Sequence, residues 1–151
     1  MTDIIQIVTG FFGALGFALL YNIRGKRLVA AAIGGFMSWF LFLAMGWITD
    51  SEPVRYFIVS ILISVYAEIL ARILKTPTTT FIITSLIPLI PGGALYYTMS
   101  SAFSGSLEIF LGNAQNTLSL SLALALGVMV VTASTQLILR LISVNKHHKN
   151  T

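Results

Sequence analysis

The 151-residue chain is 56% hydrophobic and only 9% charged, contains no cysteine and has a formal net charge of +4. Soluble domains carry about 25% charged residues, so this composition excludes a soluble globular domain and predicts an integral membrane protein almost throughout. The lack of cysteine excludes disulfides, thiolate metal sites and thiol catalysis, and no metal or cofactor is expected.

Five apolar segments predict an all-α fold, a polytopic membrane helix bundle of five transmembrane helices in a single domain over residues 1–151. Each segment has the ~20 apolar residues that a helix needs to cross a ~30 Å hydrocarbon core. We expect residues 100–117 to form a polar link before the last span. The expected spans cover residues 4–23, 28–48, 56–74, 81–98 and 118–142.

Glycines recur at every third position of the first expected span, at Gly10, Gly13 and Gly16. Small residues let a neighbouring helix approach closely, so this face predicts tight helix packing. The first half of the second expected span is also rich in small residues and suits the same contact. A dinucleotide-binding loop is a poor alternative, because the pattern lacks G-x-G-x-x-G and lies in a helix.

Polar residues recur at every fourth position of the third expected span, at Ser60, Ser64, Glu68 and Arg72. This spacing places them on one helical face. A charge near the centre of a span costs roughly 2.5–3.5 kcal/mol on insertion scales, so the face should point into the bundle or toward water. Two interpretations stay open: Glu68 and Arg72 neutralise each other as a structural pair, or they couple ion movement, with Glu68 as the protonatable group.

The fourth expected span is broken at its centre by residues 88–93, PLIPGG. Proline removes a backbone donor, glycine allows unusual turns, and a broken helix in hydrocarbon leaves costly unpaired N–H and C=O groups. Such backbone survives only where protein or a water-filled cavity covers it. The half-helix that follows would direct free N–H groups at a carboxylate, whereas a kinked helix without a ligand is the alternative. The expected substrate-binding residues are Pro88, Pro91, Gly92 and Gly93.

Four polar side chains are weaker candidates for substrate contacts: Thr84, Ser85, Tyr96 and Gln136. Gln136 in the fifth span and Glu68 in the third lie at a similar expected depth, roughly 9 Å from one end of their helices. The two side chains would then hydrogen bond across helices. Ordinary packing of serine, threonine and glutamine between helices is the alternative.

Charge distribution predicts how the chain lies in the membrane. With five spans, all basic residues except Arg55 fall on one side, and all acids except Glu68 fall with Arg55. The positive-inside rule then places the N-terminus outside and the C-terminus in the cytoplasm. A count of four spans, with a re-entrant fourth segment, would move the basic tail outside and is disfavoured. Because the basic residues reflect topology, nucleic acid is not an expected partner.

Three sequence segments resemble the small half of the threonine/serine exporter (ThrE) family. They are residues 19–22 (LLYN) at the end of the first span, residues 67–72 (AEILAR) followed by Pro77, and residues 87–93 (IPLIPGG). They occur in the same order and at similar spacing over nearly the whole chain. The proline–glycine segment is the most specific of the three.

The resemblance implies that this five-span half works with a larger half that has five spans of its own. Together they would form an exporter of threonine and serine, or of a small dicarboxylate such as succinate, in the bacterial cytoplasmic (inner) membrane. The resemblance also implies that export uses the proton gradient. The larger half is not within these 151 residues. The expected partners are therefore a larger ThrE-family membrane subunit, membrane lipid and a small carboxylate substrate.

Three functions follow from these patterns. The first is the small membrane subunit of a secondary exporter for small carboxylate-bearing metabolites. The second is a self-sufficient homo-oligomeric transporter or channel, and the third is an assembly subunit that does not itself transport. An enzyme is the least expected class, because the sequence has no nucleophile–base pair, metal cluster or phosphate-binding loop.

Overall fold

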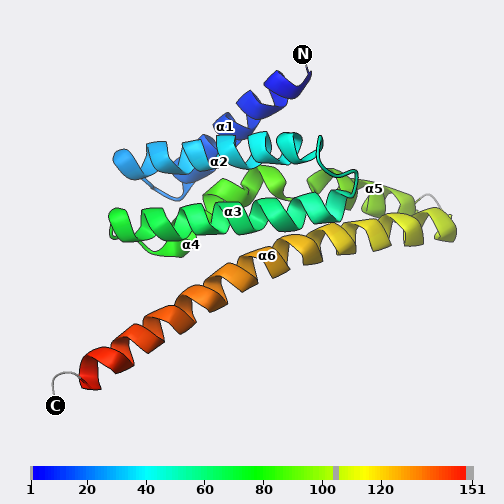
Figure 1. The fold of residues 1–151 in the computed structure, drawn as a ribbon. Helices are drawn as coiled ribbons and strands as arrows, with labels where there is room; N and C mark the ends of the chain where they lie inside the picture. Colours follow the sequence, from blue (N-terminus) through cyan, green and yellow to red (C-terminus); the bar gives the residue numbers. More distant parts are fainter. Residues whose placement is uncertain (1, 104–105, 149–151) are drawn as a thin grey trace.

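The computed structural model of the protein describes residues 2–103 and 106–148. These residues form six α-helices and one 3-10 turn, and no strand occurs among them (Figure 1). The predicted all-α class is therefore confirmed. The elements are α1 (Thr2–Leu20), α2 (Lys26–Met45), α3 (Glu52–Ile73), α4 (Thr78–Leu86), η1 (Ile87–Leu89), α5 (Gly92–Phe103) and α6 (Leu107–His148).

Four of the described helices, α1, α2, α3 and α6, are each long and apolar enough to cross a membrane. The pair formed by Thr78–Leu89 and Gly92–Phe103 passes the same test together, with a bend of 58° at the break. The described chain therefore has four spans, or five if the bent pair crosses as one. Successive helices run back and forth along the bundle, and the two termini lie at opposite ends (Figure 1). An odd number of crossings places the termini in this way.

Two hydrophobic clusters hold the helices together. The first joins α1, α2, α3 and α4, where alanines surround the fully buried Phe81. The second joins α2, α3, α4, η1 and α6, and its buried members include Ile63, Leu89 and Leu120. Because Leu89 belongs to η1, the break in the chain is attached to the bundle core on its inner side.

The closest helix approaches occur at glycines. A Cβ on Gly35 of α2 would overlap the Ala14 Cβ of α1, and a Cβ on Gly127 of α6 would overlap the Ser60 Oγ of α3. A Cβ on Gly10 of α1 would lie 3.3–3.6 Å from atoms of α2 and η1, so this glycine makes the close contact that the sequence predicted. The prediction was wrong for the other two glycines of that face, because the Cβ positions of Gly13 and Gly16 face open space.

The link between the last two spans differs from the expectation. Helix α5 continues to Phe103 and α6 begins at Leu107, so most of residues 100–117 are helical. The polar residues there join the two helices: the Thr98 and Thr117 hydroxyls lie 2.8 Å apart, and the Asn113 amide donates to Ser101 Oγ at 3.2 Å. Side chains typical of a solvated loop are instead contacts between helices.

Helix α6 is longer than a membrane is thick. Its 42 residues correspond to about 63 Å at 1.5 Å per residue, twice a ~30 Å hydrocarbon core. The helix contacts α3 at Gly127 and still buries Val131, and its C-terminal part then diverges from the bundle (Figure 1). Leu137, Ile138 and Leu139 of this diverging part are exposed on the described chain.

Candidate functional site at the break between α4 and α5

The chain changes direction within five residues after α4. Pro88 lies in the 3-10 turn η1, and Ile90 then adopts an extended conformation with φ −61° and ψ 123°. The Gly92 N–H donates to the Ile90 carbonyl at 2.6 Å, and the Leu95 N–H donates to the Pro91 carbonyl at 3.0 Å as α5 begins. The predicted break is therefore present, and a new helix N-terminus starts directly after it.

Gly92 and Gly93 leave the start of α5 uncovered. Both are exposed, and a Cβ on either one would have no atom within 4 Å. Among the described glycines only Gly25 has a positive φ, so these two are not required by the turn itself. The first N–H groups of a helix have no intrahelical partners, and here the helix begins with two residues that carry no side chain. The two glycines therefore leave open space at the start of α5 and do not adopt a backbone conformation that only glycine allows.

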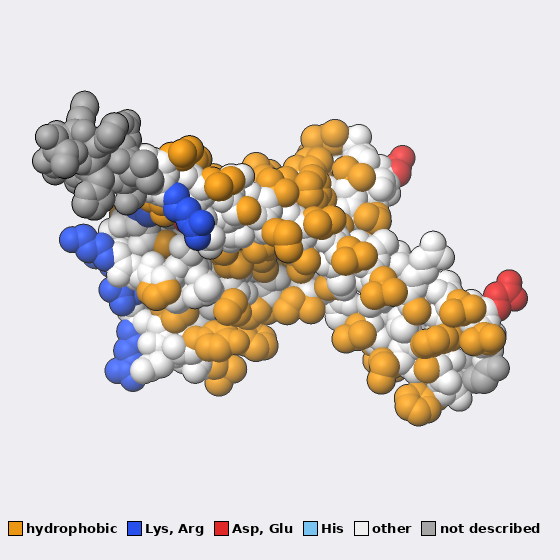
Figure 2. All heavy atoms as spheres, turned by 90° about the horizontal axis from the view of Figure 1, so that it is seen from below, with side chains coloured by type: hydrophobic (Ala, Val, Ile, Leu, Met, Phe, Trp, Pro, Cys, Tyr) orange, Lys and Arg blue, Asp and Glu red, His pale blue; other side chains and the backbone are white. Residues whose placement is uncertain are grey.

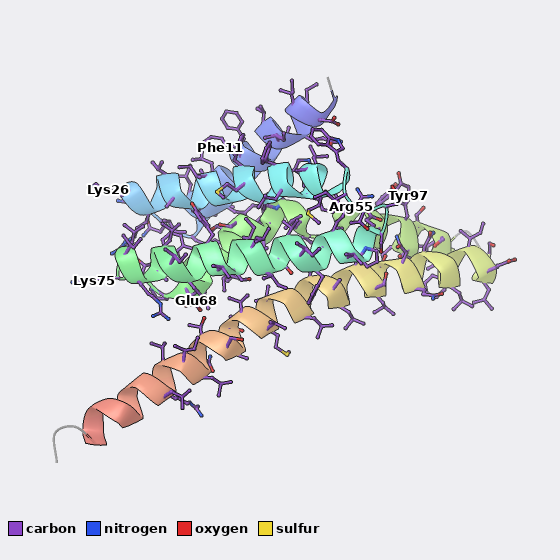
Figure 3. All side chains as sticks on the ribbon, in the orientation of Figure 1. Phe11, Lys26, Arg55, Glu68, Lys75 and Tyr97 are labelled. Atoms are coloured by element: carbon purple, nitrogen blue, oxygen red, sulfur yellow. The ribbon has the colours of Figure 1, made fainter. Side chains whose placement is uncertain are left out.

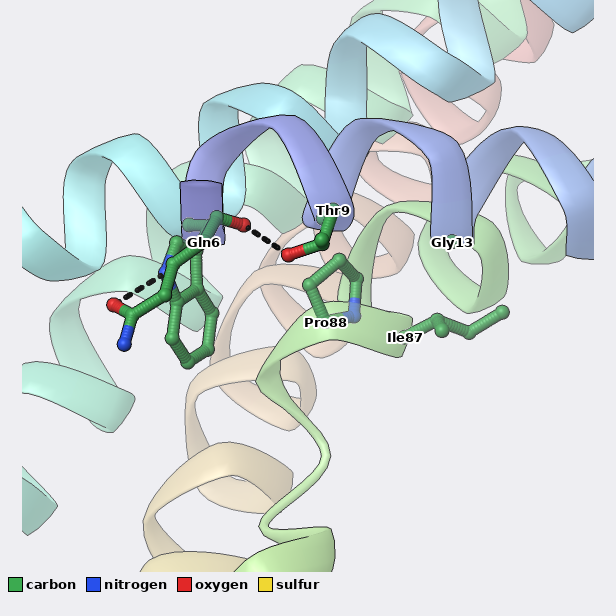
Figure 4. Close-up of a pocket in the computed structure, with 7 residues that line it drawn as sticks. Gln6, Thr9, Gly13, Ile87 and Pro88 are labelled. Atoms are coloured by element: carbon green, nitrogen blue, oxygen red, sulfur yellow. Dashed lines mark hydrogen bonds between the residues drawn. The ribbon is translucent and has the colours of Figure 1, made fainter. Parts of the chain in front are cut away.

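A pocket lies on the other side of the break, between η1, α1 and α2 (Figure 4). The Trp39 indole N–H donates to Gln6 Oε1 at 3.4 Å, and the Thr9 hydroxyl donates to the Gln6 carbonyl at 2.9 Å. The sequence reasoning missed these residues, although Gln6 and Thr9 are polar residues within an apolar span. The pocket has a volume of about 220 Å³ and is lined by Gln6, Thr9, Gly10, Gly13, Trp39, Ile87 and Pro88.

The candidates Thr84 and Ser85 lie in α4 and are fully buried. The Thr84 hydroxyl donates to the Thr80 carbonyl at 2.8 Å within its own helix. Ser85 Oγ has no hydrogen-bond partner among the described residues and lies directly against Gly34 of α2. Tyr66 of α3 meets the same glycine, so three helices converge there. The structure places both hydroxyls in helix packing.

We expect Gly34→Ala to destabilise this junction by about 1–3 kcal/mol, because overpacked cores lose energy of that order. The new Cβ would overlap Ser85 Oγ and lie 2.7 Å from Ser85 Cβ. Adding Ser85→Gly removes both atoms and should restore most of the stability, since the remaining neighbour at 3.1 Å is a ring atom of Tyr66. Detergent-induced unfolding of the two variants measures the difference. Equal stability of the single variant and the unsubstituted protein would contradict this contact.

The candidates Tyr96 and Gln136 lie on the surface of the described chain. Tyr96 is 67% exposed, and its ring packs edge-on against Tyr97 with centroids 5.6 Å apart. Gln136 is exposed on the diverging part of α6, and no hydrogen bond joins it to Glu68 among the described residues. The structure therefore does not bring Gln136 to the carboxylate as one interpretation of the sequence expected.

Glu68 lies where α3 and α6 begin to separate (Figure 3). Ser60 and Ser64 on the same face of α3 are fully buried, and the Glu68 side chain is 16% exposed. Glu68 Oε2 lies 4.0 Å from Arg72 Nη2, and the Arg72 side chain is 53% exposed. The polar face therefore begins inside the bundle and emerges at Arg72. An ion pair of this length and exposure contributes about 0–1 kcal/mol, so it explains little of the stability.

A helical bundle with a span broken partway along its length, next to a span that carries a partly buried carboxylate, is typical of multi-pass membrane transporters. The model of the family described as Threonine/Serine exporter, ThrE matches residues 6–134, and the chain belongs to this family. The protein is thus a threonine/serine exporter-type membrane transporter. No curated protein and no solved structure gives a match.

Proposed function

We propose that the chain is the small membrane subunit of a secondary exporter for small carboxylate-bearing metabolites, either threonine and serine or a dicarboxylate such as succinate. Its substrate site is the break between α4 and α5. The observation that carries the proposal is the helix N-terminus at the exposed Gly92 and Gly93, where a Cβ added to either glycine would have no atom within 4 Å beyond its neighbours in the chain.

The position of the break supports binding of a carboxylate. Helix α4 begins at Thr78 and η1 begins nine residues later, so the break is about 13 Å along the span, near the middle of a ~30 Å core. The α5 dipole places partial positive charge at the Gly93 and Ala94 amides, which favours an anionic group. Pro88 and Pro91 keep this N-terminus separate from α4, because neither residue has an N–H to continue the helix.

The exposure of the break supports a partner. Backbone groups at membrane depth are not tolerated against lipid, so another protein surface must cover this side of α5. We assign that cover to the larger ThrE-family subunit, and the substrate then lies between the two chains. A self-sufficient homo-oligomer would instead cover the break with a second copy. Reconstitution of the chain alone in liposomes separates these cases, because only the homo-oligomer exports substrate without the larger subunit.

Glu68 and Arg72 complete the proposal as the ion-coupling pair. Glu68 is partly buried at the point where α6 diverges, so it would bind and release a proton with limited access to water. In the bacterial cytoplasmic membrane, the N-terminus would lie outside and the C-terminus in the cytoplasm. The support for this orientation is that Lys and Arg side chains gather at one end of the molecule and Asp and Glu at the other (Figure 2).

The experiment that tests the site replaces Gly92 and Gly93 together with leucine. Both positions face open space, so the folded chain should accept the change without strain, whereas the new side chains would cover the amides that receive the carboxylate. We expect export by the complete transporter to fall at least about tenfold, the effect of losing ~1.4 kcal/mol of binding. Efflux of labelled substrate from proteoliposomes measures the rate.

Gly112→Leu is the matched control, because its Cβ position in α6 also faces open space. Amounts of assembled complex are measured in parallel for all variants. Full export by the double variant would show that the break does not receive the substrate. Reduced complex formation with unchanged export per complex would instead identify an assembly subunit.

A further inference from the structure

We propose that the end of the bundle that carries the α1–α2 and α3–α4 loops binds the headgroups of anionic phospholipids. We call this surface the basic end. Figure 3 shows Lys26 at the start of α2 and Lys75 just after the end of α3, both at this end, and Figure 2 shows Lys and Arg side chains gathered at the same end of the molecule. Its residues are Arg24, Lys26, Arg27, Arg72 and Lys75.

The local backbone brings the two loops together. Asn22 and Gly25 have positive φ values of 57° and 64°, which turn the chain tightly between α1 and α2. Asn22 Oδ1 accepts a hydrogen bond from Arg24 Nε at 2.9 Å. Arg27 Nη2 reaches the Leu74 carbonyl at the end of α3, at 3.4 Å. The cations of the two loops therefore form one surface rather than separate exposed side chains.

Most of this positive charge is uncompensated. Among the described side chains the only ion pair joins Arg72 to Glu68, and Arg24, Lys26, Arg27 and Lys75 have no carboxylate within 4.0 Å. Arg55 lies at the opposite end of the molecule (Figure 3). A concentration of unpaired cations on one face attracts a polyanionic surface and is screened by salt.

Apolar side chains next to the basic end favour a lipid over a free anion. Leu20 and Tyr21 precede the cations of the first loop, Ile73 precedes Lys75, and all three are exposed. A phospholipid would place its phosphate on the cations and its acyl chains along these side chains, as basic surfaces at membrane boundaries do. Inorganic phosphate or a soluble polyanion would contact the cations alone.

The test uses the full chain with any partner it retains, purified in neutral detergent and titrated with phosphatidylglycerol or phosphatidylcholine. Thermal unfolding reports binding as a rise in Tm. We expect phosphatidylglycerol to raise Tm and phosphatidylcholine to have a much smaller effect. In Arg24→Gln/Lys26→Gln/Lys75→Gln, the apparent affinity for phosphatidylglycerol should fall about 100-fold, at about fivefold for each cation. Arg27 is left in place because it bonds to the Leu74 carbonyl.

Two control variants separate charge from folding. Lys26→Arg/Lys75→Arg keeps the charge and should keep the Tm rise, and Arg55→Gln removes a cation from the opposite end and should also keep it. An unchanged affinity in the triple variant, or an equal response to phosphatidylcholine, would overturn the proposal. An equal Tm rise with inorganic phosphate would show a site for free anions and would overturn the lipid assignment.

Discussion

Replacing Gly127 with alanine should separate α6 from α3. The new Cβ would overlap Ser60 Oγ and would lie 2.7 Å from the Phe57 carbonyl oxygen, which belongs to the backbone and cannot rotate away. We expect the free energy of unfolding to fall by about 1–3 kcal/mol or more, as for other overpacked contacts. The chain contains no cysteine, so Leu120→Cys introduces a single thiol. Leu120 lies on α6 and is buried in the second hydrophobic cluster. Reaction of this thiol with a maleimide should accelerate when Gly127→Ala is added.

Two companion variants make the interpretation specific. Gly112→Ala changes a glycine of the same helix that faces open space and should leave thiol reactivity unchanged. Ser60→Gly combined with Gly127→Ala should restore only part of the stability, because the Phe57 carbonyl remains in the way. If Gly127→Ala keeps the thiol protected, the helices do not cross at this position.

Glu68→Gln should remove the dependence of export on the proton gradient. Glutamine has nearly the shape of glutamate but does not bind and release a proton, so a coupled transporter should lose at least about 10-fold in rate, or ~1.4 kcal/mol. Export from proteoliposomes is measured over a series of internal and external pH values. Unchanged rates with unchanged pH dependence would show that the carboxylate is structural.

Arg72→Gln tests the other member of the pair. The two charged groups lie 4.0 Å apart and Arg72 is 53% exposed, so removing the arginine should change stability by at most about 1 kcal/mol. If Glu68 couples proton movement, export by Arg72→Gln should still depend on pH, but the dependence should be shifted to a different pH range. If the pair is only structural, both variants should show the same small loss of stability and normal export.

The break between α4 and α5 was predictable from the sequence, but the role of its glycines was not. Two prolines and two glycines within one apolar segment predicted a ruptured helix, and the structure contains it with a 58° bend. The role expected for the glycines was wrong, because Gly92 and Gly93 do not have positive φ values, and their Cβ positions face open space. Whether a glycine serves backbone conformation or access depends on its neighbours in space, and these are absent from local sequence.

The weaker site candidates and the last link show the same limit. Ser85 was a candidate cavity residue, and only the position of Gly34, far away in sequence, showed that it fills a helix contact. Residues 100–117 contain polar side chains that suggested a loop, yet Thr117 and Asn113 pair with α5. A polar side chain is satisfied equally by water or by another helix, so composition does not distinguish a loop from an interface.

By itself, the sequence determined the class of protein, the all-α fold, the place of the break and the separation of charge between the two ends. These features follow from hydrophobic length, proline chemistry and charge, which act locally along the chain. Only the tertiary structure decided which glycines touch another helix, that Gln6, Thr9 and Trp39 line a pocket beside Pro88, and that α6 leaves α3 near Glu68. The physical reason is that these depend on contacts between helices, and the contacts are set by packing in three dimensions.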